Sequence, residues 1–382
     1  MRVAVLGAGN GGLASAFDFA QHGHEVALYA RPEYGDHIHS VAEAGGITAE
    51  GQLEGFAPVR YAGYEAAEAL DGAELALVVG PAYATEPLAA DAAPHLADGT
   101  AVLVCPGSCA GAIAFKRTLG VEPEDDRFVV GESHTLPYAV RITGPAEITV
   151  FLKLSTSMFV AGVPRAGTDR LYELIAEVWP ATVKADSVMQ TTLQNGNPVI
   201  HPAVTLLNAA RIERTGGDFL FYEDGVTEGV GRLIEAVDDE RLAIAAALGV
   251  TVLSEPAIGV EQGYMTEENY STGYSTAPGF LGIGAQSQLD HRYLTEDVGY
   301  GLVFFSDLAA RLDVPTPAMD ALITVASVVL ARDFRAEGKR TLATLGLDDL
   351  SPEQLAALEL RPGARRACAP RAATPPRSPC GR

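Results

Sequence analysis

The sequence predicts an α/β protein with a mainly parallel sheet in its first half and only helices in its second half. The first half contains short apolar runs that break at glycine or proline and continue into helix-like segments, a pattern typical of βα units. These runs occupy residues 2–6, 25–29, 75–79 and 101–105. In the second half, apolar residues recur every three or four positions, which indicates amphipathic helices. The longest such segments are 227–248, 301–312 and 318–334.

The chain of 382 residues is long enough for two domains. The change of pattern places the first at residues 1–190 and the helical one at residues 191–360. Residues 361–382 are rich in Arg, Pro and Ala and almost lack large apolar side chains, so we expect this tail to be disordered.

The first strand leads directly into the glycine pattern Gly7-x-Gly9-x-x-Gly12. In a dinucleotide-binding Rossmann domain, the first glycine permits a tight turn and the second lets the backbone approach a pyrophosphate. The third permits close packing of helix on strand. Asn10 lies at the start of this helix, whose free N–H groups and dipole favour phosphate. The pattern therefore predicts a binding site for NAD or NADP.

The end of the second strand indicates which of the two cofactors is bound. An acidic residue there favours the ribose 2′-OH of NAD, whereas an arginine favours the 2′-phosphate of NADP. Arg31 lies near this position with Glu33 two residues further on, so the sequence favours NADP and leaves NAD open. The turns after two later strands contain Pro81 and Pro106. We expect both to line the cofactor cleft, because ligands bind at the carboxyl ends of parallel strands.

Three further segments are less regular. Residues 45–63 are rich in glycine and alternate like a hairpin, and residues 128–163 alternate like strands that extend the sheet in antiparallel fashion. Residues 254–299 have no clear period, and a loop of that length inside a compact domain is usually functional or disordered. Its tyrosines either line a substrate mouth or face solvent: Tyr264, Tyr270 and Tyr274.

A histidine opens the predicted helix in the middle of the chain. Asn197 is suited to cap this helix, and Pro198 is suited to its first turn, where a missing N–H costs nothing. His201 would then lie in the first turn. Imidazole titrates near neutral pH, so a histidine held by a fixed backbone is a candidate proton donor. The alternative is a histidine that only caps the helix.

The composition excludes several classes of protein. The net charge of −22 includes six arginines in the tail, so the rest is still more acidic, which argues against nucleic acid or an anionic membrane as a partner. We expect neither a signal peptide nor a membrane span, because residues 1–3 lead directly into a strand and no run of eighteen apolar residues occurs. The four cysteines lack zinc-like spacing with histidine, so we expect a cytoplasmic protein without a metal site. Cys105 and Cys109 have no basic neighbour in the sequence and are interpreted as packing residues.

Four motifs in the second half together resemble the opine dehydrogenase family. They are Asn197-Pro-Val-Ile-His-Pro, Phe219-Leu-Phe-Tyr222, Asp239-Glu-Arg241 and His291-Arg-Tyr-Leu-Thr-Glu-Asp297, and the resemblance extends from residue 1 to about residue 335. It implies a Rossmann domain joined to an all-α substrate domain. It also implies an NAD(P)H-dependent reaction in which an amino acid condenses with a 2-oxo acid such as pyruvate and the imine is reduced. The family commonly continues with Val-Pro, whereas this chain has Val298-Gly299, which predicts a looser start of the next helix.

The resemblance also implies roles for three residues. His201 matches the catalytic histidine, Asp297 matches its carboxylate partner, and Arg292 matches the arginine that binds a substrate carboxylate. These roles fit the chemistry, because an imine accepts hydride only when its nitrogen is protonated or hydrogen-bonded. A carboxylate stabilises an imidazolium, and a planar guanidinium binds carboxylates with two hydrogen bonds. A loop salt bridge is the structural alternative for Arg292 and Asp297. Cofactor and substrate would lie in different domains, so we expect closure about a hinge near Gly196.

Two other functions stay open. One is an NAD(P)-dependent reductase of a 2- or 3-hydroxy acid, with His201 as the base for an alcohol; a lysine-based pair would favour it, but lysines are very few in the second half before Lys339. The other is a non-catalytic NADP sensor that signals by domain closure. The apolar helical half is compatible with a homodimer. The sequence identifies neither the amino acid nor the 2-oxo acid, and it leaves the stereochemistry of the product open.

Overall fold

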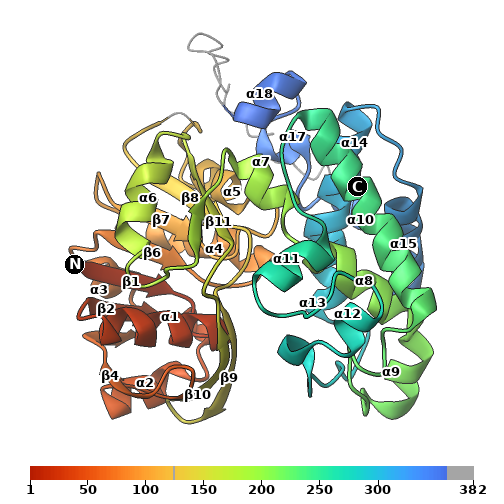
Figure 1. The fold of residues 1–382 in the computed structure, drawn as a ribbon. Helices are drawn as coiled ribbons and strands as arrows, with labels where there is room; N and C mark the ends of the chain where they lie inside the picture. Colours follow the sequence, from red (N-terminus) through yellow and green to blue (C-terminus); the bar gives the residue numbers. More distant parts are fainter. Residues whose placement is uncertain (124, 359–382) are drawn as a thin grey trace, which may run out of the picture.

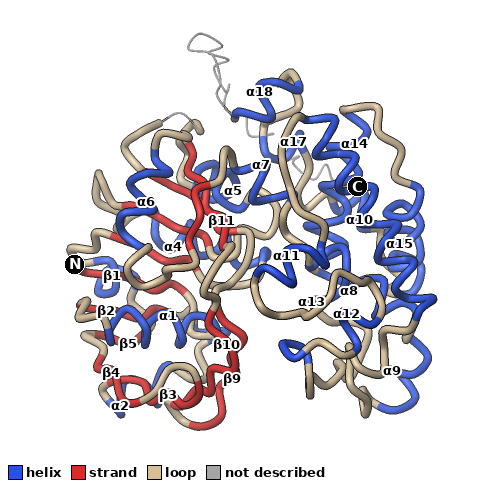
Figure 2. The backbone as a smooth tube through the Cα atoms, viewed as in Figure 1, coloured by secondary structure: helices blue, strands red, loops and turns tan. Residues whose placement is uncertain are grey.

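The computed structural model describes residues 1–123 and 125–358 and confirms the predicted fold class. The sheet-containing part and the helical part lie side by side (Figure 1). Strands are confined to the first part, whereas the second consists of helices and loops (Figure 2). The tail predicted to be disordered, 361–382, lies outside the described residues.

The main sheet has eight strands in the order β12-β11-β8-β7-β6-β1-β2-β5. Their bounds are β1 (Arg2–Leu6), β2 (Glu25–Tyr29), β5 (Tyr61–Gly63), β6 (Leu75–Val78), β7 (Ala101–Val104), β8 (Val129–Ser133), β11 (Met158–Val163) and β12 (Thr182–Lys184). The strands from β8 to β5 run parallel, and β11 pairs antiparallel with β8. The strand order reverses between β1 and β6, and in such sheets the ligand crevice lies at that point.

Both faces of this sheet are buried, as is usual for a parallel sheet. Along β1, Val3 and Val5 belong to one apolar core, whereas Ala4 and Leu6 belong to the other. The first core includes α1 (Asn10–Gln21) and α6 (Gly167–Ile175). The second core includes α3 (Ala66–Leu70), α4 (Thr85–Ala92) and α5 (Gly111–Thr118) and continues without interruption into the helical half.

A second sheet of four strands packs on α1 and corrects one prediction. It has the order β4-β3-β10-β9, with β3 (Gly46–Gly51), β4 (Gly55–Pro58), β9 (Tyr138–Gly144) and β10 (Glu147–Lys153). The hairpin predicted within 45–63 is confirmed. The prediction that 128–163 adds antiparallel strands to the main sheet is right only for β11, because β8 is parallel and β9 and β10 belong to the second sheet. Alternation identifies a strand but not its partner.

The helical half is built around α8 (Asn197–Leu207), which α10, α13, α15 and the π-helical turn η4 contact. The bounds are α7 (Val188–Leu193), α9 (Ala209–Thr215), α10 (Glu228–Leu248), α11 (Glu255–Glu261), α12 (Thr272–Ser275), α13 (Arg292–Thr295), η4 (Asp297–Leu302), α14 (Val303–Arg311), α15 (Pro317–Val329), α16 (Phe334–Glu337), α17 (Leu342–Leu345) and α18 (Pro352–Ala357). Within the described ranges, no helix is both long and apolar enough to cross a bilayer.

Two predictions for this half need correction. The segment 318–334 is not one helix, because α15 ends at Val329 and Ala331 adopts a positive φ of 51°. No glycine or proline marks the break, so the apolar spacing in the sequence continues across it. The segment 254–299 is not a plain loop either, since it contains three short helices, α11, α12 and α13.

Candidate active site

The glycine turn after β1 has the geometry that a dinucleotide requires. Gly7 has φ +123°, and a Cβ there would lie 2.0 Å from the carbonyl oxygen of Val79. A Cβ at Gly12 would lie 1.8 Å from the carbonyl oxygen of Gly7. A Cβ at Gly9, in contrast, would meet nothing within 4 Å, and Gly9 borders two cavities. The fold therefore requires the first and third glycines, while the second leaves room for a pyrophosphate beside the N-terminus of α1.

A cavity of about 190 Å³ adjoins this turn at the carboxyl end of β2, where an adenosine would lie. Arg31 lines it, but the guanidinium is already compensated: Nε lies 3.0 Å from Asp91 Oδ2 and Nη2 lies 3.5 Å from Glu33 Oε1. Tyr29 donates its hydroxyl to the same oxygen of Asp91 at 2.8 Å. The sequence analysis missed Asp91, because this residue of α4 is distant from Arg31 along the chain.

The substitution Arg31→Asp tests whether Arg31 reads the 2′-phosphate. We expect the ratio of KM for NADPH to KM for NADH to rise roughly 10- to 100-fold, because a charged hydrogen bond is lost and a third carboxylate joins Asp91 and Glu33. Steady-state kinetics with each cofactor measures this ratio. Arg60→Asp, an exposed arginine bonded to backbone carbonyls, is the control. An unchanged ratio in Arg31→Asp would mean that the 2′-phosphate is read elsewhere.

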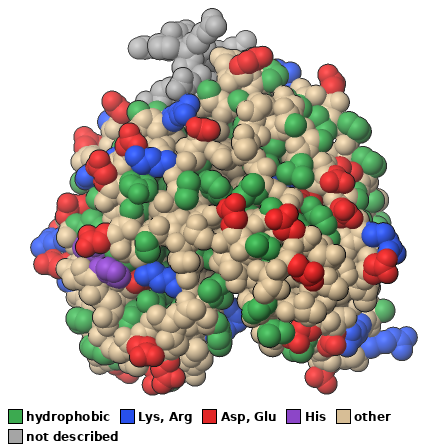
Figure 3. Space-filling view, in the orientation of Figure 1, with side chains coloured by type: hydrophobic (Ala, Val, Ile, Leu, Met, Phe, Trp, Pro, Cys, Tyr) green, Lys and Arg blue, Asp and Glu red, His purple; other side chains and the backbone are tan. Residues whose placement is uncertain are grey.

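A larger cleft of about 470 Å³ extends from the glycine turn to the helical half. It brings together residues that the sequence analysis selected from distant segments: Asn10, Pro81, Pro106, His201 and Arg292. The side-chain oxygen of Asn10 accepts a hydrogen bond from the backbone N–H of Ile142 at 2.7 Å, which ties α1 to β9. Figure 3 shows acidic side chains on both lobes and an indentation between the lobes at the lower edge.

His201 lies on α8, slightly further into the helix than predicted. The N-cap position is Gly196 rather than Asn197, and no side chain caps the helix from there. Asn195 Oδ1 instead accepts a hydrogen bond from the N–H of Asn197 at 3.2 Å. Pro198 occupies the first turn as predicted, and His201 follows directly after that turn. Helix starts are hard to place to within two residues, because several neighbouring asparagines have the same capping chemistry.

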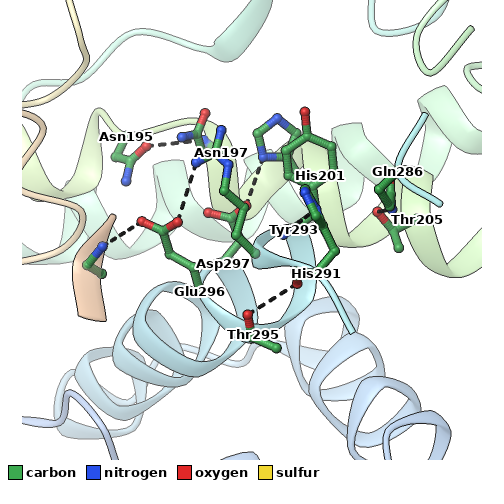
Figure 4. A network of polar contacts seen from close by, with 12 residues as sticks. Asn195, Asn197, His201, Thr205, Gln286, His291, Tyr293, Thr295, Glu296 and Asp297 are labelled. Atoms are coloured by element: carbon green, nitrogen blue, oxygen red, sulfur yellow. Dashed lines mark hydrogen bonds and ion pairs between the residues drawn. The ribbon is translucent and has the colours of Figure 1, made fainter. Parts of the chain in front are cut away.

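Both ring nitrogens of His201 have partners, and Figure 4 shows the contact with Asp297. Nδ1 lies 2.8 Å from Asp297 Oδ2, and Nε2 lies 3.1 Å from the hydroxyl of Tyr222. The ring stacks on Tyr293 with centroids 3.9 Å apart. Since a carboxylate only accepts, Nδ1 carries a proton and Nε2 accepts from Tyr222. His201 is therefore not a helix-capping residue. The sequence analysis quoted Tyr222 within a motif but did not assign it a role.

Asp297 reaches His201 because η4 approaches α8 closely. A Cβ at Gly301 would lie 2.3 Å from Cγ of Pro198, so a larger residue would push the two elements apart. The looser helix start predicted from Val298-Gly299 takes the form of this wide π-helical turn, which begins at Asp297. The carboxylate of Asp297 contacts His201 and does not form the loop salt bridge with Arg292.

Burial is the main influence on the protonation states of His201 and Asp297. Burial, assisted by the positive charge of Arg292, lowers the pKa of His201 well below 6.5. Burial raises the pKa of Asp297 to about 7, and Arg292 opposes this rise. The imidazole is therefore neutral in this closed site, and it needs an additional negative charge nearby before it becomes an imidazolium. Within residues 1–123 and 125–358, no three His, Cys, Asp or Glu side chains are grouped so as to hold a metal ion.

Arg292 projects into the cleft with 44% of its side chain exposed. Its Nη1 lies 3.4 Å from Oε2 of Glu296, whose other oxygen accepts the N–H of Ala82 at 2.8 Å. Glu296, which the sequence analysis also missed, thus joins the helical half to the turn after β6. Its position between Arg292 and Asp297 in one motif was the only signal for it.

A second side chain from the helical half holds the cofactor turns. Arg340 is fully buried, and its Nη1 donates to the carbonyl oxygens of Gly107, Ser108 and Cys109 at 3.0, 2.6 and 2.9 Å. Ser108 and Cys109 both have positive φ. A basic group therefore does lie beside Cys109, although none is its neighbour in the sequence. Burial nevertheless raises the pKa of the Cys105 thiol to about 12 and raises that of Cys109, so neither is a thiolate.

Comparisons with known proteins identify both parts of the chain. The family model "NAD/NADP octopine/nopaline dehydrogenase, alpha-helical domain" matches residues 184–330, and the ketopantoate reductase PanE/ApbA model matches residues 3–106. An opine dehydrogenase of Arthrobacter sp. (strain 1C) is 36% identical over 356 residues, which cover 91% of this chain and 96% of that protein. A vitopine synthase of Allorhizobium ampelinum is 30% identical over 365 residues, covering 93% and 98%.

Solved structures share the whole fold. Octopine dehydrogenase in complex with NADH and agmatine superposes with a TM-score of 0.76 at 18% identity, covering 96% of this chain and 100% of that one. Yersinopine dehydrogenase with bound NADP⁺ superposes with a TM-score of 0.69 at 16% identity, covering 94% and 97%.

Proposed function

The chain belongs to the opine dehydrogenase family, and we propose on this basis that it joins an amino acid to a 2-oxo acid and reduces the resulting imine to an N-(carboxyalkyl) amino acid. It is an NAD(P)-dependent oxidoreductase acting on CH–NH groups. The observation that carries the proposal is the buried pair of His201 and Asp297, which faces the same cleft as the glycine turn.

His201 is the proposed proton donor to the imine nitrogen. The amine and the ketone lose water to form the imine, and bound NAD(P)H supplies the hydride to its carbon. Because Asp297 occupies Nδ1, the proton leaves from Nε2. The Tyr222 hydroxyl holds Nε2 at 3.1 Å until a substrate nitrogen replaces it. Asp297 fixes the ring and stabilises the imidazolium.

Substrate binding itself favours the protonated form of His201. The positive charge of Arg292 helps to lower the pKa of His201 in the free protein. A substrate carboxylate bound to Arg292 compensates this charge, so the pKa of His201 rises when the substrate arrives. The protonated form of His201 is therefore more favoured in the loaded site than in the free protein.

The substitution Arg292→Ala is expected to raise the apparent KM for a carboxylate substrate roughly 10- to 100-fold, because a charged hydrogen bond is lost. The KM for NAD(P)H should change little, since the glycine turn holds the cofactor. Arg292→Lys keeps the charge but loses the planar fork, so its KM should be intermediate. Arg232→Ala, which removes an exposed ion pair on α10, is the control. Equal effects on the KM of substrate and cofactor would assign Arg292 a structural role.

Three further parts of the proposal concern the chain as a whole. Arg31 lines the adenosine cavity, which supports NADP as the preferred cofactor. The last strand of the main sheet ends at Lys184 and α8 begins at Asn197, which supports a domain boundary near residue 190. The two domains would then close about a hinge at Gly196. During this closure, the contacts of Glu296 and Arg340 with the cofactor turns would connect the two domains.

The proposed function is tested by following the oxidation of NADPH and NADH with amino acids crossed against pyruvate, glyoxylate and 2-oxoglutarate. Oxidation that requires both partners is the expected result. Oxidation by a 2-oxo acid alone would instead identify a hydroxyacid reductase. Cofactor binding without turnover of any pair would contradict reductive condensation and favour a sensor.

A further inference from the structure

A second cavity opens off the catalytic cleft next to His201. It measures about 150 Å³. Its lining comes mainly from the loop between α7 and α8, from the start of α8, from α11 and from the segment between Tyr264 and Phe280, and it also includes Tyr222 and two residues that follow β8. Five of these residues also line the cleft and form the mouth between the two spaces: Thr135, Asn197, Tyr222, Tyr264 and Phe280. Tyr222 is the residue whose hydroxyl bonds to His201, so the cavity lies directly beside the proposed proton donor.

Aromatic rings form one wall of this cavity. The ring of Phe280 is nearly parallel to those of Tyr222, Tyr264 and Tyr274, with centroid distances of 4.4, 5.4 and 5.8 Å and interplanar angles of 20, 14 and 21°. The faces of such rings carry negative charge density and attract cations. Of the tyrosines in 254–299, Tyr264 and Tyr274 thus line a substrate space, whereas Tyr270 bonds to Asp238.

Glu255 contributes a buried carboxyl group to the same cavity. It is the first residue of α11 and is 8% exposed. Among the described residues its side chain makes no hydrogen bond and no ion pair. The neighbouring cation, Arg241, is already committed to Asp238 at 2.6 Å and to the carbonyl oxygen of Leu253 at 2.7 Å. Burial raises the pKa of Glu255 to about 8, opposed by Arg241.

A second buried polar group in the cavity also has no partner. The hydroxyl of Tyr274 is buried without a hydrogen bond, and the residue is 1% exposed. Gln194, in contrast, uses both ends of its amide on Leu253. Among residues 1–123 and 125–358, no Lys or Arg lines the cavity, and burial lowers the pKa of His134 to about 3, so the described lining carries no positive charge. Glu255 and Tyr274 are therefore two buried groups of this cavity that have free hydrogen-bonding capacity within the described part of the chain.

These features indicate which chemical group would bind in the cavity. A buried carboxyl without a counter-ion is unfavourable, and a cation bound beside it removes that cost. A cavity of 150 Å³ accepts a group about as large as benzene, which matches a short alkyl chain that ends in an ammonium or guanidinium group. An amino acid with its nitrogen at His201 and its carboxylate at Arg292 would extend its side chain past Tyr222 into this space.

We propose that this cavity is the subsite for the side chain of the amine substrate and that Glu255 selects side chains that end in a cation. The inference rests on the proposed function and specifies its substrate class. Glu255 acts here as a specificity-determining residue and takes no part in proton or hydride transfer.

The test compares amino acids that differ in charge but closely match in shape: arginine against citrulline, and lysine against 2-aminoheptanoic acid. With saturating cofactor and pyruvate, we expect kcat/KM to favour the cationic member of each pair at least about tenfold, as for one charged hydrogen bond. Glu255→Gln should abolish this preference by lowering kcat/KM for the cations only. Glu261→Gln, on the same helix but bonded to Ser157, is the control. A wild-type preference for the neutral members, or an equal loss on all four in Glu255→Gln, would overturn the proposal.

Calorimetry separates this proposal from the reaction itself. If no pair is turned over, reductive condensation fails, but binding of arginine and citrulline to the cofactor-loaded protein still decides the subsite. Tighter binding of arginine that Glu255→Gln removes would support it. Equal binding of the two, or a preference that survives Glu255→Gln, would refute it.

Discussion

Replacing His201 with alanine is expected to lower the turnover number by about 10²- to 10⁴-fold, the usual contribution of a positioned proton donor. The affinity for NAD(P)H should stay nearly unchanged, because the cofactor turn lies on the sheet and makes no contact with the imidazole. Pre-steady-state kinetics and a cofactor titration measure the two quantities separately. A variant with normal turnover would remove His201 from the mechanism.

The control for this substitution is Tyr222→Phe. It removes only the hydroxyl at 3.1 Å from Nε2 and keeps the ring that stacks on Phe280. Since the substrate nitrogen is proposed to replace this hydroxyl, the loss of turnover should stay below about tenfold, the cost of one ordinary hydrogen bond. A loss as large as that of His201→Ala would instead make Tyr222 the proton donor.

The substitution Asp297→Asn should also lower the rate of imine reduction by about 10²-fold or more, but with a change in pH dependence that His201→Ala cannot show. The amide keeps the shape of the carboxylate and loses its charge. Burial and Arg292 already lower the pKa of His201, and the variant no longer has a carboxylate at Nδ1 to stabilise the imidazolium against them. Because reduction needs the protonated imidazole, its pH optimum should move to lower pH. The reverse reaction needs the neutral imidazole and should be affected less.

The pH profiles of both directions measure this shift, and Glu296→Gln is the comparison. The negative charge of Glu296 also raises the pKa of His201, but Glu296 makes no hydrogen bond with the ring, whose partners are Asp297 and Tyr222. Its neutralisation should therefore move the optimum in the same direction by a smaller amount. If Asp297→Asn loses activity while the pH optimum stays in place, Asp297 only orients the ring.

The parts of the fold that follow from local patterns were predictable. The glycine turn is an example, since Gly7 and Gly12 meet backbone atoms at distances that no side chain tolerates. The second sheet was not predictable. Its strands β3 and β10 pair although about a hundred residues separate them, and the sequence of neither strand indicates its partner. The end of α15 was hidden as well, because Ala331 adopts a left-handed conformation without a glycine to announce it.

The residues of the candidate site likewise divide into those that the sequence predicted and those that it did not. Motifs located His201, Arg292 and Asp297, and the structure brings the first and last into contact. Tyr222, Glu296 and Glu255 were missed as functional residues, because their importance depends on burial and on partners that are remote in the sequence. Glu255 illustrates the limit: a single glutamate after a serine reads as part of an ordinary helix start, and only the tertiary structure shows that it faces a cavity without a counter-ion.

The contacts of Arg340 also bear on the order in which parts of the chain can fold during synthesis. Its partners Ala82 and Gly107 precede it by 258 and 233 residues. A ribosome therefore releases the entire glycine motif, and both turns beside it, long before the side chain that ties those turns together has been synthesised. A nascent chain that ends before Arg340 contains every residue of the nucleotide motif, yet the carbonyl groups of the turn after β7 still lack their donor. We therefore expect the turns beside the glycine motif to reach their final form late in synthesis, when the helical half is complete.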